Sequence, residues 1–273
     1  MQYKFNDDTL IHGIGFNPMK LEGILKYGIV TENYAENNNI LYARNYNFTL
    51  NDEMLSKFGN GNINEQLENA NKNNIFLIRT LYISDDPLSA YNMYIKNGIS
   101  MIVEDVPFIY DTGKELIKRS DEVIVKEFIS KDKIKAIMIP DEYKNKRLDE
   151  VDMLPNNILN YGLIKNSVAT LITYLQEYGY EVEIDELSYL LADLKTAYLS
   201  IKSLDKNNSD YNDAMLDYKE IISEINNFLS ECVYECFSEM LGFDATVSDM
   251  VTFINSKYDN KDICYLDGKV RMR

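Results

Sequence analysis

Apolar residues are spaced in two different ways along this chain of 273 residues. Up to about residue 140 they gather in short runs separated by Gly, Asn and Pro, a pattern typical of strands and short helices. Beyond residue 157 they recur at helical spacing over long stretches, which is typical of amphipathic helices. The pattern therefore predicts an α+β region followed by an all-α helical bundle.

The first region is expected to contain five or six strands with small helices between them. The strand candidates are "TLIHGIG", "ILYARNYNF", "IFLIRTLYIS", "ISMIVED", "EVIVKEFI" and "IKAIMIP". One helix is predicted over "NPMKLEGILKYG", because Asn17 and Pro18 are start signals and Gly28 is a stop signal. A second helix is predicted over "PLSAYNMYIKNG", closed by Gly98.

The second region is expected to form three or four antiparallel helices. They correspond to "NNILNYGLIKNSVATLITYLQEYGY", "IDELSYLLADLKTAYLSIKSL", "SDYNDAMLDYKEIISEINNFLSECVYECFSEMLG" and a shorter "TVSDMVTFINSKY". The polar stretch between the regions ends near a proline. The predicted organisation is a first domain over 1–142, a linker over 143–157 and an acidic helical bundle over 158–273.

The charge is strongly negative and unevenly distributed. Lys and Arg number 28 against 44 Asp and Glu, which gives a net charge of −16. Residues 1–150 hold 18 basic and 23 acidic residues, whereas residues 151–273 hold 10 and 21. Such acidity disfavours non-specific attraction to nucleic acid and anionic membranes, and it favours a basic protein partner for the helical half. No signal peptide or spanning run is seen, so we expect a cytoplasmic protein, or one delivered into a host or target cell without a classical signal peptide.

Several kinds of site lack their sequence signals. There is no phosphate-binding Walker loop, no dinucleotide fingerprint and no nucleophile-elbow motif. Three cysteines (Cys232, Cys236 and Cys264) and one histidine do not supply the paired ligands of a zinc site, so the thiols are expected in the core or at the surface and no metal is expected.

Three residues of the first region could form a site together. His12 ends a predicted strand, Arg44 lies in the next extended segment, and Glu122 opens the strand "EVIVKEFI". Each also has an ordinary structural interpretation. His12 could be a turn or core histidine, Arg44 an ion-pair residue, and Glu122 a solvated carboxylate at a strand edge.

Two segments resemble the ADP-ribosyltransferase superfamily. "LIHGIGFNPMKLEGILKYGIV" is similar to its opening, a strand ending in His followed by "x-L-x-x-I-L-x-x-G-[IL]", and "SDEVIVKEFISKDKIKAIMIP" is similar to its late glutamate strand. "NGISMIVEDVPFI" also resembles a strand of such domains. The likeness is nearest to the bacterial DNA-targeting toxin branch, the DarT-like proteins, and covers residues 8–140. This chain has Ile14 where those toxins carry a hydroxyl residue.

The resemblance implies a split β-sheet domain that binds NAD. Glu122 would stabilise the cationic ribose formed when nicotinamide leaves, and Arg44 would neutralise the pyrophosphate or steer the acceptor. His12, Gly13 and Ile14 would line the NAD site, with His12 and the Gly13 backbone holding adenosine ribose or nicotinamide. The tyrosine that stacks on nicotinamide would be Tyr42, Tyr46 or Tyr82.

The expected function is thus NAD-dependent transfer of ADP-ribose to a macromolecule, with release of nicotinamide. A protein acceptor is slightly favoured over nucleic acid, because the first region shows no basic track. The alternative is a non-enzymatic acidic module or inhibitor that binds a basic partner through its helical half. An acidic mimic of nucleic acid is a third interpretation.

Overall fold

The computed structural model describes residues 9–40, 69, 72–79, 98–106, 110–111, 122–155, 159–205, 208–258 and 260–266. The chain divides into two compact units. A sheet unit combines Met1–Lys144 with Ser248–Arg273, and a helical unit comprises Asn145–Val247. The described residues therefore confirm the predicted mixed α+β class.

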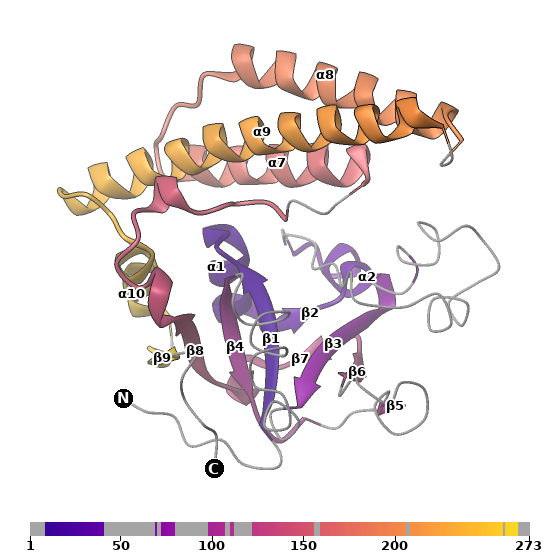
Figure 1. Cartoon of the computed structure of the whole chain (residues 1–273). Helices are drawn as coiled ribbons and strands as arrows, with labels where there is room; N and C mark the ends of the chain where they lie inside the picture. The colour runs from indigo at the N-terminus through magenta and orange to yellow at the C-terminus, as the bar shows by residue number, and fades with distance from the viewer. Residues whose placement is uncertain are drawn as a thin grey trace. The chain divides into compact units, whose positions relative to one another are not determined.

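The sheet unit is built on a seven-stranded sheet (Figure 1). Its strands run in the order β5-β6-β3-β1-β4-β8-β9, and all neighbours are antiparallel except β8 and β9, which are parallel. The strands are β1 (Leu10–Gly15), β3 (Asn74–Arg79), β4 (Ile99–Val103), β5 (Tyr110–Asp111), β6 (Glu122–Lys126), β8 (Ile134–Pro140) and β9 (Asp262–Leu266). A separate two-stranded sheet pairs β2 (Ile29–Val30) with β7 (Phe128–Ile129).

The central strands are buried on both faces. Every residue of β4 is buried, and β8 has one half-buried residue, Lys135. A strand covered on both sides exposes neither face to water. Its sequence is therefore a continuous apolar run, without the alternation of apolar and polar residues that a half-exposed strand has. The predicted strands "ISMIVED" and "IKAIMIP" are of this kind, and the structure confirms both.

Local signals fix the helix that follows β1. In α1 (Pro18–Tyr27) the Asn17 side chain accepts hydrogen bonds from the backbone N–H groups of Met19 and Lys20, at 3.0 and 3.2 Å. Gly28 ends the helix at a φ of 94°, in the region that favours glycine. The predicted start and stop are therefore confirmed. A short α2 (Glu32–Asn37) follows β2.

The helical unit contains α7 (Tyr161–Glu177), α8 (Ile184–Ser203) and α9 (Ser209–Leu241). Helix α8 packs along α9, and Figure 1 shows the two lying side by side. Asn208 caps α9 by accepting from Asp210 N–H, and Gly242 ends it at a φ of 78°. The three long helices confirm the prediction, and the cap residue Asn208 lies one position before the predicted segment.

The C-terminal segment differs from the prediction. The bundle was expected to run to residue 273, but α10 (Val247–Ser256) leads back into the sheet unit, where β9 pairs with β8. The helical unit is thus an insertion between β8 and β9. Periodicity could not reveal this, because the β9 ladder depends on a strand more than a hundred residues earlier in the chain.

The predicted linker over 143–157 is also more ordered than expected. It begins at Tyr143, the last residue of the 3-10 turn η5 (Asp141–Tyr143), and it contains the 3-10 turn η6 (Leu148–Glu150), which packs on α9. Its apolar residues Leu148, Val151, Met153 and Leu154 are buried. These four side chains anchor the segment, although the acidic residues between Leu148 and Met153 give it a polar composition.

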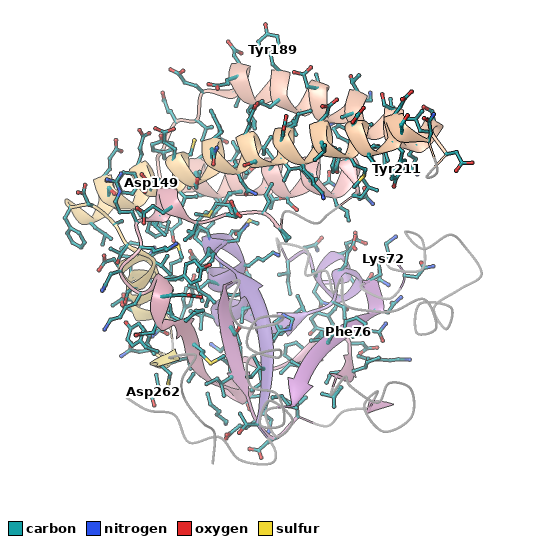
Figure 2. The ribbon with its side chains drawn as sticks, viewed as in Figure 1. Lys72, Phe76, Asp149, Tyr189, Tyr211 and Asp262 are labelled. Carbon is teal, nitrogen blue, oxygen red and sulfur yellow. The ribbon has the colours of Figure 1, made fainter. Side chains whose placement is uncertain are left out.

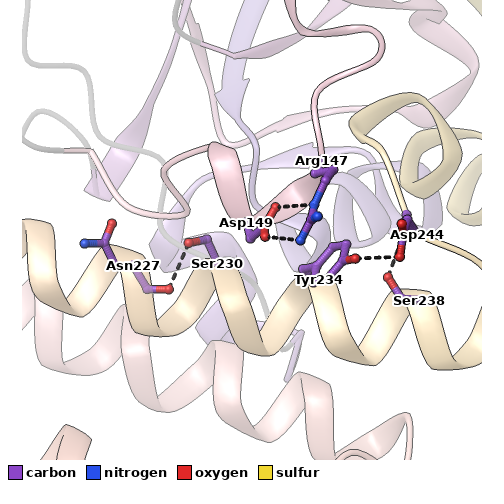
Figure 3. Close-up of polar contacts among 8 residues, drawn as sticks. Arg147, Asp149, Asn227, Ser230, Tyr234, Ser238 and Asp244 are labelled. Carbon is purple, nitrogen blue, oxygen red and sulfur yellow. Dashed lines mark hydrogen bonds and ion pairs between the residues drawn. The ribbon is translucent and has the colours of Figure 1, made fainter.

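A cation–π contact joins this segment to α9, and Figure 3 shows the polar contacts on either side of it. The Arg147 guanidinium bonds Asp149 through two nitrogens and lies 4.4 Å from the centre of the Tyr234 ring. The Tyr234 hydroxyl donates to Asp244 at 2.7 Å. Arg147 is exposed, so the ion pair contributes little stability, about 0–1 kcal/mol.

Among the described residues, no helix combines the length and the apolar character that crossing a membrane requires.

Candidate functional site

The only histidine of the chain is buried in β1. His12 is 7% exposed, and its Nδ1 lies 3.1 Å from the carbonyl oxygen of Phe76 on β3 (Figure 2, where Phe76 is labelled). A carbonyl oxygen can only accept, so Nδ1 carries the hydrogen and donates it. This bond joins neighbouring strands and fixes the orientation of the imidazole ring.

The other ring nitrogen of His12 is a buried acceptor. Burial is the main reason that the pKa of His12 falls from 6.5 to about 4; the Phe76 bond opposes this fall and the nearby Lys20 adds to it. The ring is therefore neutral at pH 7, and Nε2 holds a lone pair. Nε2 is buried and has no hydrogen-bond partner in the described part of the chain. Buried polar atoms in folded proteins nearly always form hydrogen bonds. A ligand that donates a hydrogen bond to Nε2 would satisfy this atom.

The backbone next to His12 is open on one side. Gly13 is exposed, and it pairs with Ser100 on β4. Ser100 is fully buried, and its hydroxyl is another buried polar atom that lacks a partner among the described residues. At Gly98 a Cβ would stand 2.3 Å from the Cα of Gly15, so these two backbone segments approach more closely than a side chain at Gly98 would allow.

The strand register places the backbone of Glu122 two strands from β1. Glu122 pairs with Ile78 on β3, and Ile78 pairs with Ile11, the residue before His12. Adjacent strands are spaced by about 4.8 Å, so Glu122 and Ile11 stand roughly 10 Å apart along this row. The register thus aligns the position of Glu122 with Ile11, and not with His12, across segments about 110 residues apart in sequence. The side chain of Glu122 lies outside the described atoms.

Other predicted site residues fall outside the described ranges. These are Arg44, Tyr42, Tyr46 and Tyr82. Ile14 is described, and its side chain is buried in the core of the sheet unit. Of the predicted cofactor residues, the structure thus describes His12, Gly13 and Ile14.

Lys20 is a residue near His12 that the sequence reasoning missed. It is the third residue of α1 and is half-buried. Burial lowers its pKa to about 8, and it lies close enough to His12 to lower the pKa of the imidazole. The available signal was its place just after the start signals Asn17 and Pro18, which put it in the first turn of the helix that follows the His12 strand.

The cysteines are buried thiols in two different units. Cys232 and Cys236 lie on α9, and Cys264 lies on β9. Burial raises the pKa of Cys232 to about 11, which keeps it protonated and unreactive. Within the described ranges, no three His, Cys, Asp or Glu side chains are grouped so that they could hold a metal ion.

Comparison of the chain with models of protein families, with curated proteins and with solved structures finds no match.

Proposed function

We propose that this chain is an NAD-dependent ADP-ribosyltransferase, which releases nicotinamide and transfers ADP-ribose to a macromolecule. The observation that carries the proposal is the state of His12: a buried, neutral imidazole, oriented by Phe76 O, whose Nε2 is left as an acceptor. NAD offers donors of the right kind in its ribose hydroxyls and its carboxamide. The two separate sheets are consistent with the split-sheet domain that the resemblance implies.

In the proposed reaction the bond between nicotinamide nitrogen and ribose C1′ breaks, and its electron pair leaves with nicotinamide. The ribose becomes cationic, and the Glu122 carboxylate stabilises that charge. A nucleophilic atom of the acceptor then attacks C1′ and gives up its proton to the Glu122 carboxylate, which acts as a base. His12 and the exposed backbone of Gly13 hold the dinucleotide, Arg44 neutralises its pyrophosphate or steers the acceptor, and one tyrosine stacks on nicotinamide.

The test is nicotinamide release from NAD by the purified chain. Removing a charge that acts in the transition state typically lowers the rate by about a hundredfold or more, so Glu122→Gln should lose at least that much. Glu127→Gln is the matched control, because Glu127 follows the same strand and is exposed. Two results would each reject the proposal: equal rates in the two variants, or a wild-type chain that releases no nicotinamide and gains no thermal stability from millimolar NAD.

A protein acceptor is favoured by the distribution of charge. The sheet unit has 25 acidic and 21 basic residues, and the helical unit has 19 and 7, so neither carries an excess of the Lys and Arg that backbone phosphates attract. Labelled NAD, offered together with a basic protein or with DNA, should label the protein. Labelling of DNA alone would reverse the assignment.

A second candidate function is binding of a basic protein by the helical unit. Acidic residues recur along α9 at intervals of three, four or seven, which places them on one side of the helix, and all are exposed. They are Asp210, Asp213, Asp217, Glu220, Glu224, Glu231, Glu235 and Glu239. Like charges at this spacing each cost a few tenths of a kcal/mol, which a cationic partner would offset.

This candidate predicts salt-sensitive binding of a Lys-rich helical peptide. Replacing Asp213, Asp217 and Glu220 by their amides should weaken that binding at low salt. Unchanged affinity in the triple variant, together with NAD turnover by the wild type, would leave transfer as the function.

A further inference from the structure

The environment of Lys20 is unusual for a lysine. It stands in the first turn of α1, where the helix dipole is positive and disfavours a cation. That turn contains no acidic residue. Lys20 is also half-buried, so its ammonium has lost part of its hydration. Each of these three conditions is unfavourable for the charged form.

Among the described residues, no carboxylate forms an ion pair with Lys20. The one acidic residue of α1, Glu22, accepts a hydrogen bond from the Tyr258 hydroxyl at 2.5 Å. The backbone N–H groups of the first turn are also engaged, since those of Met19 and Lys20 donate to the Asn17 side chain. An anion at this place would therefore meet the lysine side chain and the field of the helix, and it would break no ion pair within the described ranges.

The nearby His12 limits what kind of anion this could be. Its Nε2 is a buried acceptor and requires a donor such as a hydroxyl, whereas Lys20 requires a negative group. A ligand that satisfies both carries a hydroxyl and an anionic group within one small fragment. A ribose joined to a phosphate has this combination.

We infer that Lys20 is a ligand-binding residue, which contacts a phosphate of the nucleotide whose hydroxyl bonds His12. The identity of that nucleotide as NAD rests on the proposed function, but the phosphate contact does not. Lys20 would thus share the pyrophosphate with Arg44 or leave Arg44 free to steer the acceptor. It is a binding residue and is not required to take part in bond cleavage.

The test is calorimetric titration of the full chain with ADP-ribose and with inorganic pyrophosphate. Lys20→Met should weaken both affinities about tenfold, the size expected for one charge-assisted contact of about 1.4 kcal/mol, and Lys20→Arg should restore most of the loss. Lys26→Met is the matched control, because Lys26 lies on the same helix and is exposed. Circular dichroism and a melting curve would show that each variant is folded.

The outcomes separate this inference from the proposed function. If Lys20→Met and Lys26→Met bind ADP-ribose equally well, or if the wild type binds neither probe, Lys20 is not a phosphate contact, whatever the rate of NAD turnover. If Lys20→Met alone loses binding while the wild type releases no nicotinamide, the phosphate contact stands and the transferase proposal fails.

Discussion

Two buried polar side chains, Asn226 in the helical unit and His12 in the sheet unit, differ in how far their hydrogen bonds are satisfied. In the helical unit, Asn226 on α9 is fully buried, and its amide accepts from Leu154 N–H at 2.8 Å and donates to Leu154 C=O at 3.0 Å. In the sheet unit, His12 makes one bond and leaves Nε2 without a partner in the described part. A buried group whose hydrogen bonds are all made stabilises the fold, whereas a buried group with an unsatisfied atom can still form a hydrogen bond with a ligand.

The contrast extends to how closely the backbones approach one another. In the sheet unit, a Cβ at Gly98 would stand only 2.3 Å from the Cα of Gly15. In the helical unit, a Cβ at Gly162 of α7 would have Asn160 Oδ1 as its nearest neighbour, at 3.4 Å. A side chain at Gly98, near His12, should therefore be tolerated less well than a side chain at Gly162 of α7.

The largest effect is expected from Gly98→Ala. A Cβ at 2.3 Å from Gly15 Cα forces β1 and β4 apart beside His12, and overpacking against backbone should lower the free energy of unfolding by about 3 kcal/mol. Gly162→Ala in α7 is the control and should change it by less than about 1 kcal/mol. Urea denaturation of the two variants measures both values. Similar stabilities would mean that the sheet unit is no less tolerant than the helices.

Asn226→Ala comes next. It leaves both backbone groups of Leu154 buried without partners and should cost about 2–3 kcal/mol, whereas the exposed Asn227→Ala should cost less than about 0.5 kcal/mol. Chemical denaturation followed by circular dichroism is the measurement. A loss below 1 kcal/mol for Asn226→Ala would contradict the idea that this amide holds the segment before α7 to α9.

A smaller effect concerns the dependence of stability on pH. The pKa of His12 is about 4 in the folded chain and near 6.5 when unfolded, so the unfolded chain binds the proton more readily between these values. Stability from this group is therefore present at neutral pH and is lost as the pH falls below 6.5. The loss between pH 7 and pH 5 should be about 2 kcal/mol.

His12→Gln supplies the control for this measurement, because it keeps the carboxylates that titrate in the same range. The wild type should lose about 2 kcal/mol more than the variant between the two pH values, as measured by urea denaturation. Parallel pH profiles would show that His12 is hydrated in solution and not buried.

Local features of the sequence predicted local structure well. Asn17, Pro18 and Gly28 act within a few residues of themselves, and the bounds of α1 followed from them. The apolar runs of β4 and β8 likewise predicted strands, because burial on both faces requires such runs whatever the partner strand is.

Features that depend on distant partners could not be predicted in this way. The bond from His12 to Phe76 joins residues 64 positions apart and uses a backbone carbonyl, which any residue type provides. Strand β9 appeared to belong with the helices before it, because its partner β8 precedes the whole helical unit. Lys20 has no distinctive sequence signal and becomes a candidate only once the structure shows it half-buried, with no ion pair to the residues it describes.

The insertion of the helical unit has a consequence for synthesis on the ribosome. Residues 141–261 separate β8 from β9, so the nascent chain exposes the free edge of β8 while the three long helices are still being made. An unpaired strand edge is a template on which other chains can add. Until residues 262–266 leave the exit tunnel, protection from aggregation must come from chaperones or from early collapse of the helices.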